Sequence, residues 1–168
     1  MIGNAYHAQM PGFAGDLGHG DPGVSYSVLL AADAAGALLA GIALESWGRL
    51  KGTPRTAIML AMLWSVALLG FAAVPIYPVA IALLFCAGVF ELSFNTMAQA
   101  LVQLNAPTDI CGRVVGLFNM AGLGMRAFSG VTVGLVGAAI GVHWSLAGSA
   151  AMLLAFLLAL HRRVAARD

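Results

Sequence analysis

The chain has 168 residues, of which 61% are hydrophobic and only 9% are charged, whereas soluble proteins average about 45–50% and about 25%. A soluble enzyme or nucleic-acid-binding domain cannot cover its surface with so few charges, so an integral membrane protein is indicated. The net charge of +1 says little by itself, but the positions of the charged residues carry information.

Long apolar segments predict an all-α, polytopic membrane helix bundle that forms a single transmembrane domain over residues 1–168. Residues 1–17 are interrupted by polar residues, and their apolar part reaches only about 21 Å across a hydrocarbon core about 30 Å thick. We interpret them as the end of a helix whose beginning is missing. Complete spans are expected at residues 24–44, 56–74, 79–103, 114–141 and 144–160.

Small residues are concentrated in two of these spans. Gly36 and Gly41 lie in the span at residues 24–44, and Gly130 and Gly134 form a GxxxG pair in the span at residues 114–141. Small residues about one helical turn apart let helix backbones approach closely in a membrane. We therefore expect these glycines to serve helix packing.

The basic residues predict how the chain is oriented. All but one of the eight lie in alternate connections or in the C-terminal tail: Arg49, Lys51, Arg55, Arg113, Arg162, Arg163 and Arg167. Positively charged loops are enriched on the cytoplasmic side. The pattern predicts a multi-pass protein of the cell inner (plasma) membrane with a cytoplasmic C-terminus.

Three charged residues interrupt the predicted spans, namely Asp33, Glu91 and Arg126. Counted along each helix, all three lie roughly 14–18 Å from the membrane surface, close to the middle of the core. An ionised side chain at this depth is unfavourable and is by default functional. The three helices that carry these charges are therefore expected to line a polar centre, and the uncharged second and fifth spans are expected to face lipid.

Polar side chains extend this centre along the helices. Glu91, Asn95, Gln99 and Gln103 recur every four residues and form one stripe, while Asn119 and Arg126 are seven residues apart and share a face. We expect the two stripes to face one another. The predicted substrate and proton pathway comprises Asp33, Glu91, Asn95, Gln99, Asn119 and Arg126.

Two interpretations of these residues remain open. Glu91 and Arg126 could form an ion pair that only locks two helices together, and the amides could be interhelical hydrogen bonds of about 0.6 kcal/mol each. Because Arg126 cannot neutralise two carboxylates, one of Asp33 and Glu91 is expected to bind an exchangeable proton.

Two stretches of the sequence resemble a known family. Residues 107–120 (PTDICGRVVGLFNM) and 122–130 (GLGMRAFSG) resemble the tenth-to-eleventh helix region of major facilitator superfamily transporters, in the branch of the enterobactin exporter and macrolide efflux pumps. Residues 26–41 resemble the eighth helix of that branch. Cys111 departs from the pattern, because the family tends to place a basic residue there.

The resemblance implies a fold and a function. The chain would be the C-terminal six-helix half of a major facilitator fold with its first helix truncated, and its second and fifth complete spans would be the peripheral helices nine and twelve. The two halves of such a transporter enclose a midplane site and alternate its access. Proton-coupled efflux, an antiport, is then expected. The alternative is a truncated or accessory membrane helix bundle without transport activity of its own.

Expectations about partners and chemistry follow from the same reading. The partners would be the lipid bilayer, a small amphipathic substrate and a missing N-terminal half encoded by the same gene or a separate one, with no nucleic acid. No enzymatic activity, cofactor or metal is expected, because the sequence has no catalytic or nucleotide-binding motif. The two cysteines, Cys86 and Cys111, have neither disulfide-framework nor metal-ligand spacing.

Overall fold

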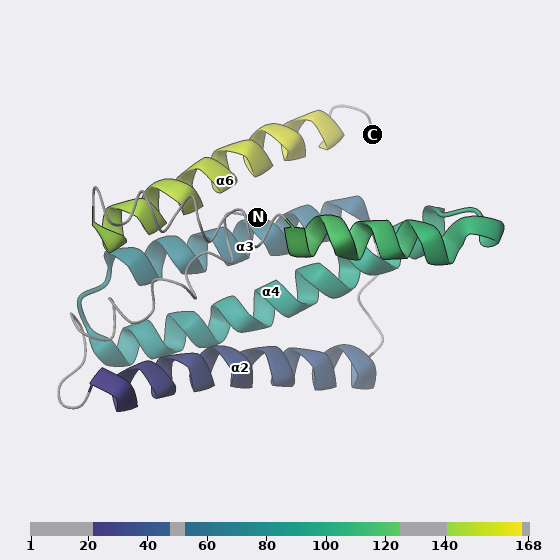
Figure 1. Ribbon diagram of the computed structural model, residues 1–168. Coiled ribbons are helices and arrows are strands. Elements are labelled where there is room, and N and C mark those ends of the chain that lie inside the picture. Colours follow the sequence, from purple (N-terminus) through teal and green to yellow (C-terminus); the bar gives the residue numbers. More distant parts are fainter. Residues whose placement is uncertain (1–21, 48–52, 125–140, 166–168) are drawn as a thin grey trace.

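The computed structural model describes residues 22–47, 53–124 and 141–165 (Figure 1). All regular structure in these ranges is helical, which confirms the all-α prediction for this part of the chain. The helices are α2 (Pro22–Trp47), α3 (Pro54–Ala73), α4 (Tyr77–Asn105), a short 3-10 helix η2 (Thr108–Ile110), a helix at residues 111–124 and α6 (Val142–Ala165).

Three of the described helices are long and apolar enough to cross a membrane, at Gly23–Ser46, Pro54–Ala73 and Tyr77–Asn105. They contain nearly all of the first three expected spans. The apolar part of α6, Trp144–Leu160, covers the last expected span and is shorter. The partial helix expected at residues 1–17, the glycine pair Gly130 and Gly134, and most of the second half of the span at residues 114–141 lie outside the described residues.

Capping residues and prolines define the ends of the helices. Thr53 caps α3, because its Oγ1 accepts a hydrogen bond from the backbone N–H of Thr56 at 3.2 Å, and Pro54 follows at the first helical position. The extended segment between α3 and α4 contains Pro75, and α4 ends at Asn105, two residues before Pro107. These residues therefore set the start of α3 and the two ends of α4.

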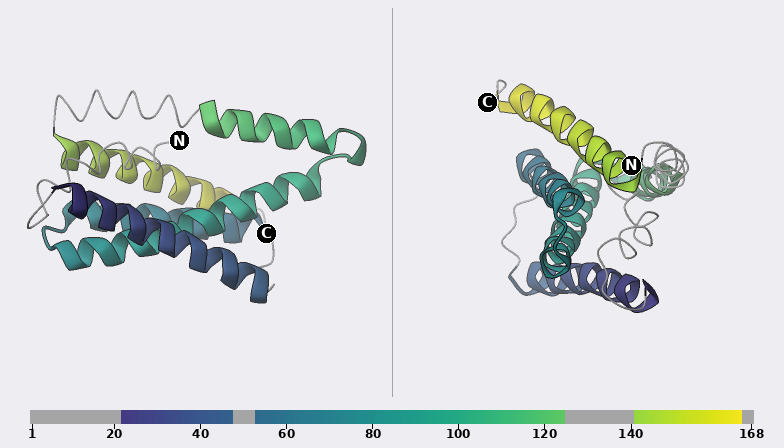
Figure 2. Two further views of the ribbon diagram at one scale, coloured as in Figure 1. Left: turned by 60° about the horizontal axis from the view of Figure 1, so that its bottom comes forward. Right: turned by 90° about the vertical axis from the view of Figure 1, so that its left-hand side faces the viewer.

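The described helices pack in the order α2, α4, α3 and α6, with α4 in contact with α2 and α3, and α3 in contact with α6. Figures 1 and 2 show the end of α2, the start of α3 and the ends of α4 and α6 at one end of the bundle. Arg55, Arg113 and Arg162 therefore belong to this same end. The helix at residues 111–124 runs back from the loop after α4 and diverges from α4 (Figure 2).

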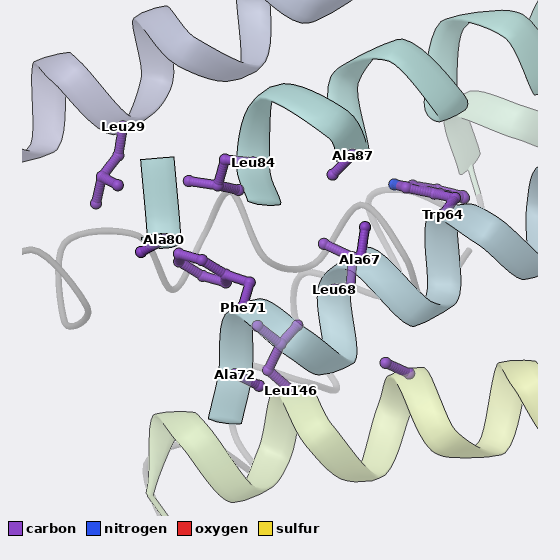
Figure 3. Close-up of a cluster of buried hydrophobic side chains, with 11 residues drawn as sticks. Leu29, Trp64, Ala67, Leu68, Phe71, Ala72, Ala80, Leu84, Ala87 and Leu146 are labelled. Carbon is purple, nitrogen blue, oxygen red and sulfur yellow. The ribbon is translucent and has the colours of Figure 1, made fainter. Parts of the chain in front are cut away.

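A core of small and large apolar side chains joins these helices (Figure 3). Phe71 and Leu68 of α3 and Leu84 of α4 are fully enclosed in it. Its members are Leu29, Trp64, Ala67, Leu68, Phe71, Ala72, Ala80, Leu84, Ala87, Leu146 and Ala150.

The position of α3 differs from the sequence-based expectation. Half of its apolar segment, 50%, is buried, against 22% for α2. Only one face, with Met59, Leu63 and Val66, is exposed as a lipid-facing helix requires. The expectation that the second span faces lipid therefore holds for one face of α3 only, because α4 and α6 cover its other side.

Candidate functional site

A groove of about 480 Å³ lies between α4 and the helix at residues 111–124. The α4 side contributes residues at positions 92, 95 and 99, which share one helix face because they are separated by three and four residues. The facing helix contributes two pairs of consecutive residues, at positions 118–119 and 122–123, which lie one turn apart. The lining residues are Leu92, Asn95, Gln99, Phe118, Asn119, Gly122 and Leu123.

Three of the six predicted pathway residues line this one groove. Asn95 and Gln99 reach it from α4 and are partly buried, and Asn119 reaches it from the facing helix and is exposed. Each primary amide offers two N–H donors and a carbonyl acceptor. The groove can therefore form hydrogen bonds with an uncharged polar group from two sides.

Apolar side chains complete the walls of the groove. Leu92 lies on the α4 side, and Phe118 and Leu123 lie on the facing helix. Binding sites for small molecules are mostly apolar, with a few placed polar groups, and have volumes of about 300–1,000 Å³. The groove has this composition and size.

The charged residues of the predicted pathway occupy different positions. Glu91 is partly buried on α4, one turn before Asn95, and does not line the groove. Asp33 is buried in α2, with 7% of its surface exposed. Arg126 lies outside the described residues, so the predicted proximity of Glu91 and Arg126 stays a prediction.

The α2–α4 crossing fixes Asp33 in place. A Cβ atom on Gly88 would overlap the backbone carbonyl oxygen of Asp33, and one on Gly36 would overlap the carbonyl oxygen of Phe85. The two backbones are therefore in direct contact, as the small residues of α2 predicted. At the start of the two helices the Tyr77 hydroxyl donates a hydrogen bond to the carbonyl oxygen of Ser25 at 3.0 Å.

The α3 helix holds the other side of α4. Trp64, which is 5% exposed, stacks on Phe94 with ring centroids 6.3 Å apart. Because Phe94 directly precedes Asn95, this stack helps to fix the rotation of α4 about its axis and hence the face that Asn95 presents.

The sequence-based prediction missed the apolar and glycine members of the groove. Gly122 and Leu123 follow Asn119 at helical spacings of three and four residues, so a search at these spacings around each polar residue would have found them. Gln103, the last member of the polar stripe, is exposed and does not line the groove.

Comparison with known proteins identifies the family. A family described as transmembrane secretion effector matches residues 1–167. Neither a curated protein nor a solved structure matches the chain. The family match covers nearly the whole length, including the residues that carry the resemblance to major facilitator transporters. The chain therefore belongs to the transmembrane secretion effector family of the major facilitator superfamily, and it is a multi-pass membrane protein with a role in efflux transport.

Proposed function

We propose that this chain supplies the C-terminal half of a secondary transporter that exports small amphipathic molecules in exchange for protons by alternating access. The groove between α4 and residues 111–124 forms part of the substrate path. The observation that carries the proposal is the meeting of Asn95, Gln99 and Asn119 in one groove inside an apolar membrane protein.

The depth of the groove fits a transport site. Asn95 lies ten residues before the end of α4 at Asn105, which corresponds to about 15 Å along the helix and so to a position inside a 30 Å core. Amide groups at this depth are unfavourable against lipid and need polar partners. A substrate or water in the groove provides such partners.

The chemistry of the lining suggests the substrate class. An apolar body would pack against Phe118, Leu92 and Leu123, while its hydrogen-bonding groups would meet the amides. The proton would bind at Asp33 or Glu91, since Glu91 is one turn from Asn95 on the same helix and Asp33 is held at the α2–α4 crossing. The end of the bundle with Arg55 and Arg113 would face the cytoplasm of the inner membrane.

Transport of a neutral fluorescent amphipath, dansylamide, tests the proposal. Everted membrane vesicles from cells that express the complete gene should accumulate it when a proton gradient is applied. Replacing Gln99 with Met keeps the side-chain length but removes the amide donors and acceptor, and should lower uptake about tenfold. The matched control is Gln103→Met, one turn further along α4 and outside the groove, which should retain wild-type uptake.

Two results would count against the proposal. Equal loss in Gln99→Met and Gln103→Met would show that the groove has no special part in transport. Binding of dansylamide without accumulation under any gradient would favour the accessory helix bundle.

A further inference from the structure

One residue in the wall of the groove has no side chain. Gly122 lines the groove on the helix at residues 111–124. A Cβ atom added there would have no described heavy atom within 4 Å. No described residue therefore fills the space beside Gly122, which adjoins the groove.

Other glycines of the chain are enclosed in a different way. At Gly36 and Gly88 the place of the missing side chain is filled by the backbone of a neighbouring helix, and at Gly70 a Cβ atom would lie 3.3 Å from Leu83. These glycines permit helix packing. Packing among the described residues does not explain Gly122.

A larger residue at position 122 would fill part of the groove. Gly122 is three residues after Asn119, so the two lie on the same side of their helix. Added carbon atoms at position 122 would therefore occupy the space next to the amide that faces α4. Glycine is also a weaker helix former than alanine, so replacing it does not weaken the helix itself.

We propose that Gly122 determines the size of the substrate that the groove accepts, as a specificity-determining position for uncharged amphipathic molecules with a bulky apolar body. This inference rests on the proposed function of the groove. The absence of a side chain leaves room for that body beside the amides. Each carbon atom added at position 122 reduces the largest body that fits.

Binding of two probes of the same chemistry tests the inference. Dansylamide is the small probe and N-cyclohexyl-dansylamide is the bulky one, and both report an apolar site by their fluorescence. The full chain is reconstituted in lipid nanodiscs, and nanodiscs without protein give the background. The variants are Gly122→Ala, Gly122→Val and Gly122→Phe.

The chain offers a matched control in the same helix. Gly116 also has no described heavy atom within 4 Å of an added Cβ, but it does not line the groove. The series Gly116→Ala, Gly116→Val and Gly116→Phe therefore repeats the same changes in helix propensity and bulk away from the groove. Circular dichroism of each variant verifies that it has folded.

The expected result is a loss of affinity that depends on the size of the probe. Gly122→Val should lower the affinity for the bulky probe by about tenfold or more and the affinity for the small probe by less than about threefold, because steric discrimination in a pocket is of this order. Gly122→Ala should show the same trend more weakly, and the Gly116 series should leave the affinity for both probes unchanged. An equal loss of affinity for both probes in Gly122→Val, or the same change in selectivity in the Gly116 series, would overturn the inference.

The same experiment separates this inference from the proposed function. If the wild-type protein binds dansylamide and Gln99→Met weakens it, but the Gly122 series keeps the wild-type preference between the two probes, only the role of Gly122 is refuted. If the wild-type protein binds neither probe above background, both are refuted.

Discussion

The α4 helix has two very different neighbours. Toward α2 it makes a closed crossing, where the carbonyl oxygen of Asp33 lies directly over Gly88. Toward the helix at residues 111–124 it makes an open groove of about 480 Å³ with amides on both walls. Glycine occurs on both sides, but the place of a side chain is filled by backbone at Gly88, whereas no described residue fills it at Gly122.

The difference shows how one membrane helix can be both anchored and functional. Without a hydrophobic driving force between helices, close backbone packing stabilises the α2–α4 pair. The anchored helix then presents Asn95 and Gln99 to the groove at a fixed rotation. We infer that the closed side gives α4 the rigidity that a substrate site on its open side requires.

Breaking the closed side should have the largest effect. Gly88→Val places a branched side chain against the carbonyl oxygen of Asp33, where the backbone of α2 must move. We expect a loss of about 3 kcal/mol or more in unfolding free energy, at the upper end of the range for overpacked cores. Denaturant unfolding in detergent micelles measures it. Gly116→Val, which meets open space, should be close to wild type.

Neutralising the carboxyl group beside the groove should abolish transport without affecting insertion. We expect Glu91→Gln to lower proton-driven dansylamide uptake by about 100-fold or more, as removal of a required proton donor or acceptor does in enzymes. The amount of protein in the membrane should stay unchanged. If Glu91→Gln and Arg126→Ala each fail to accumulate while the double variant is stable and active, the pair is a structural lock instead.

The carboxyl group on the closed side tests whether the α2–α4 crossing takes part in coupling. If the exchangeable proton binds at Asp33 and not at Glu91, uptake in Asp33→Asn should lose its dependence on the proton gradient, while downhill dansylamide exchange continues at a similar rate. Uptake is measured across a range of external pH values with and without an imposed gradient. A pH profile and rate equal to those of the wild type would exclude Asp33 as a proton site.

The smallest effect should come from the hydrogen bond at the start of the α2–α4 crossing. Tyr77→Phe removes the bond from the Tyr77 hydroxyl to the Ser25 carbonyl oxygen. We expect it to lower the unfolding free energy by only about 0.6 kcal/mol, the average for interhelical hydrogen bonds in membranes. A loss as large as that of Gly88→Val would mean that this bond, and not the backbone contact, holds the crossing.

The sequence contained enough information to predict the helices and the polar face of the site. Long apolar runs predicted the positions of α2, α3 and α4, because the thickness of the bilayer sets the length of a spanning helix. The four-residue spacing of Asn95 and Gln99 predicted that they share a face, and the structure brings Asn119 to the same groove. That these residues bind substrate stays a prediction.

Other features could not be read from the sequence. An uncharged apolar helix looks the same whether it faces lipid or protein, because lipid tails are as apolar as leucine, so the burial of α3 was missed. Likewise, the sequence does not distinguish Gly88 from Gly122, although only at Gly88 does a neighbouring backbone fill the place of the missing side chain. The burial of α3 and the surroundings of these glycines are both determined by tertiary packing.

The accessibility of the groove to water and substrate tests the central claim most directly. Single-cysteine proteins are made by replacing Cys86 and Cys111 with Ser and introducing Leu123→Cys in the groove or Leu63→Cys on the exposed face of α3. A charged, water-soluble methanethiosulfonate reagent is then applied to membrane vesicles. We predict that the cysteine at position 123 reacts and that dansylamide slows its reaction, whereas the cysteine at position 63 does not react. Equal reactivity at both positions, or no protection by dansylamide at position 123, would contradict a substrate path between α4 and residues 111–124.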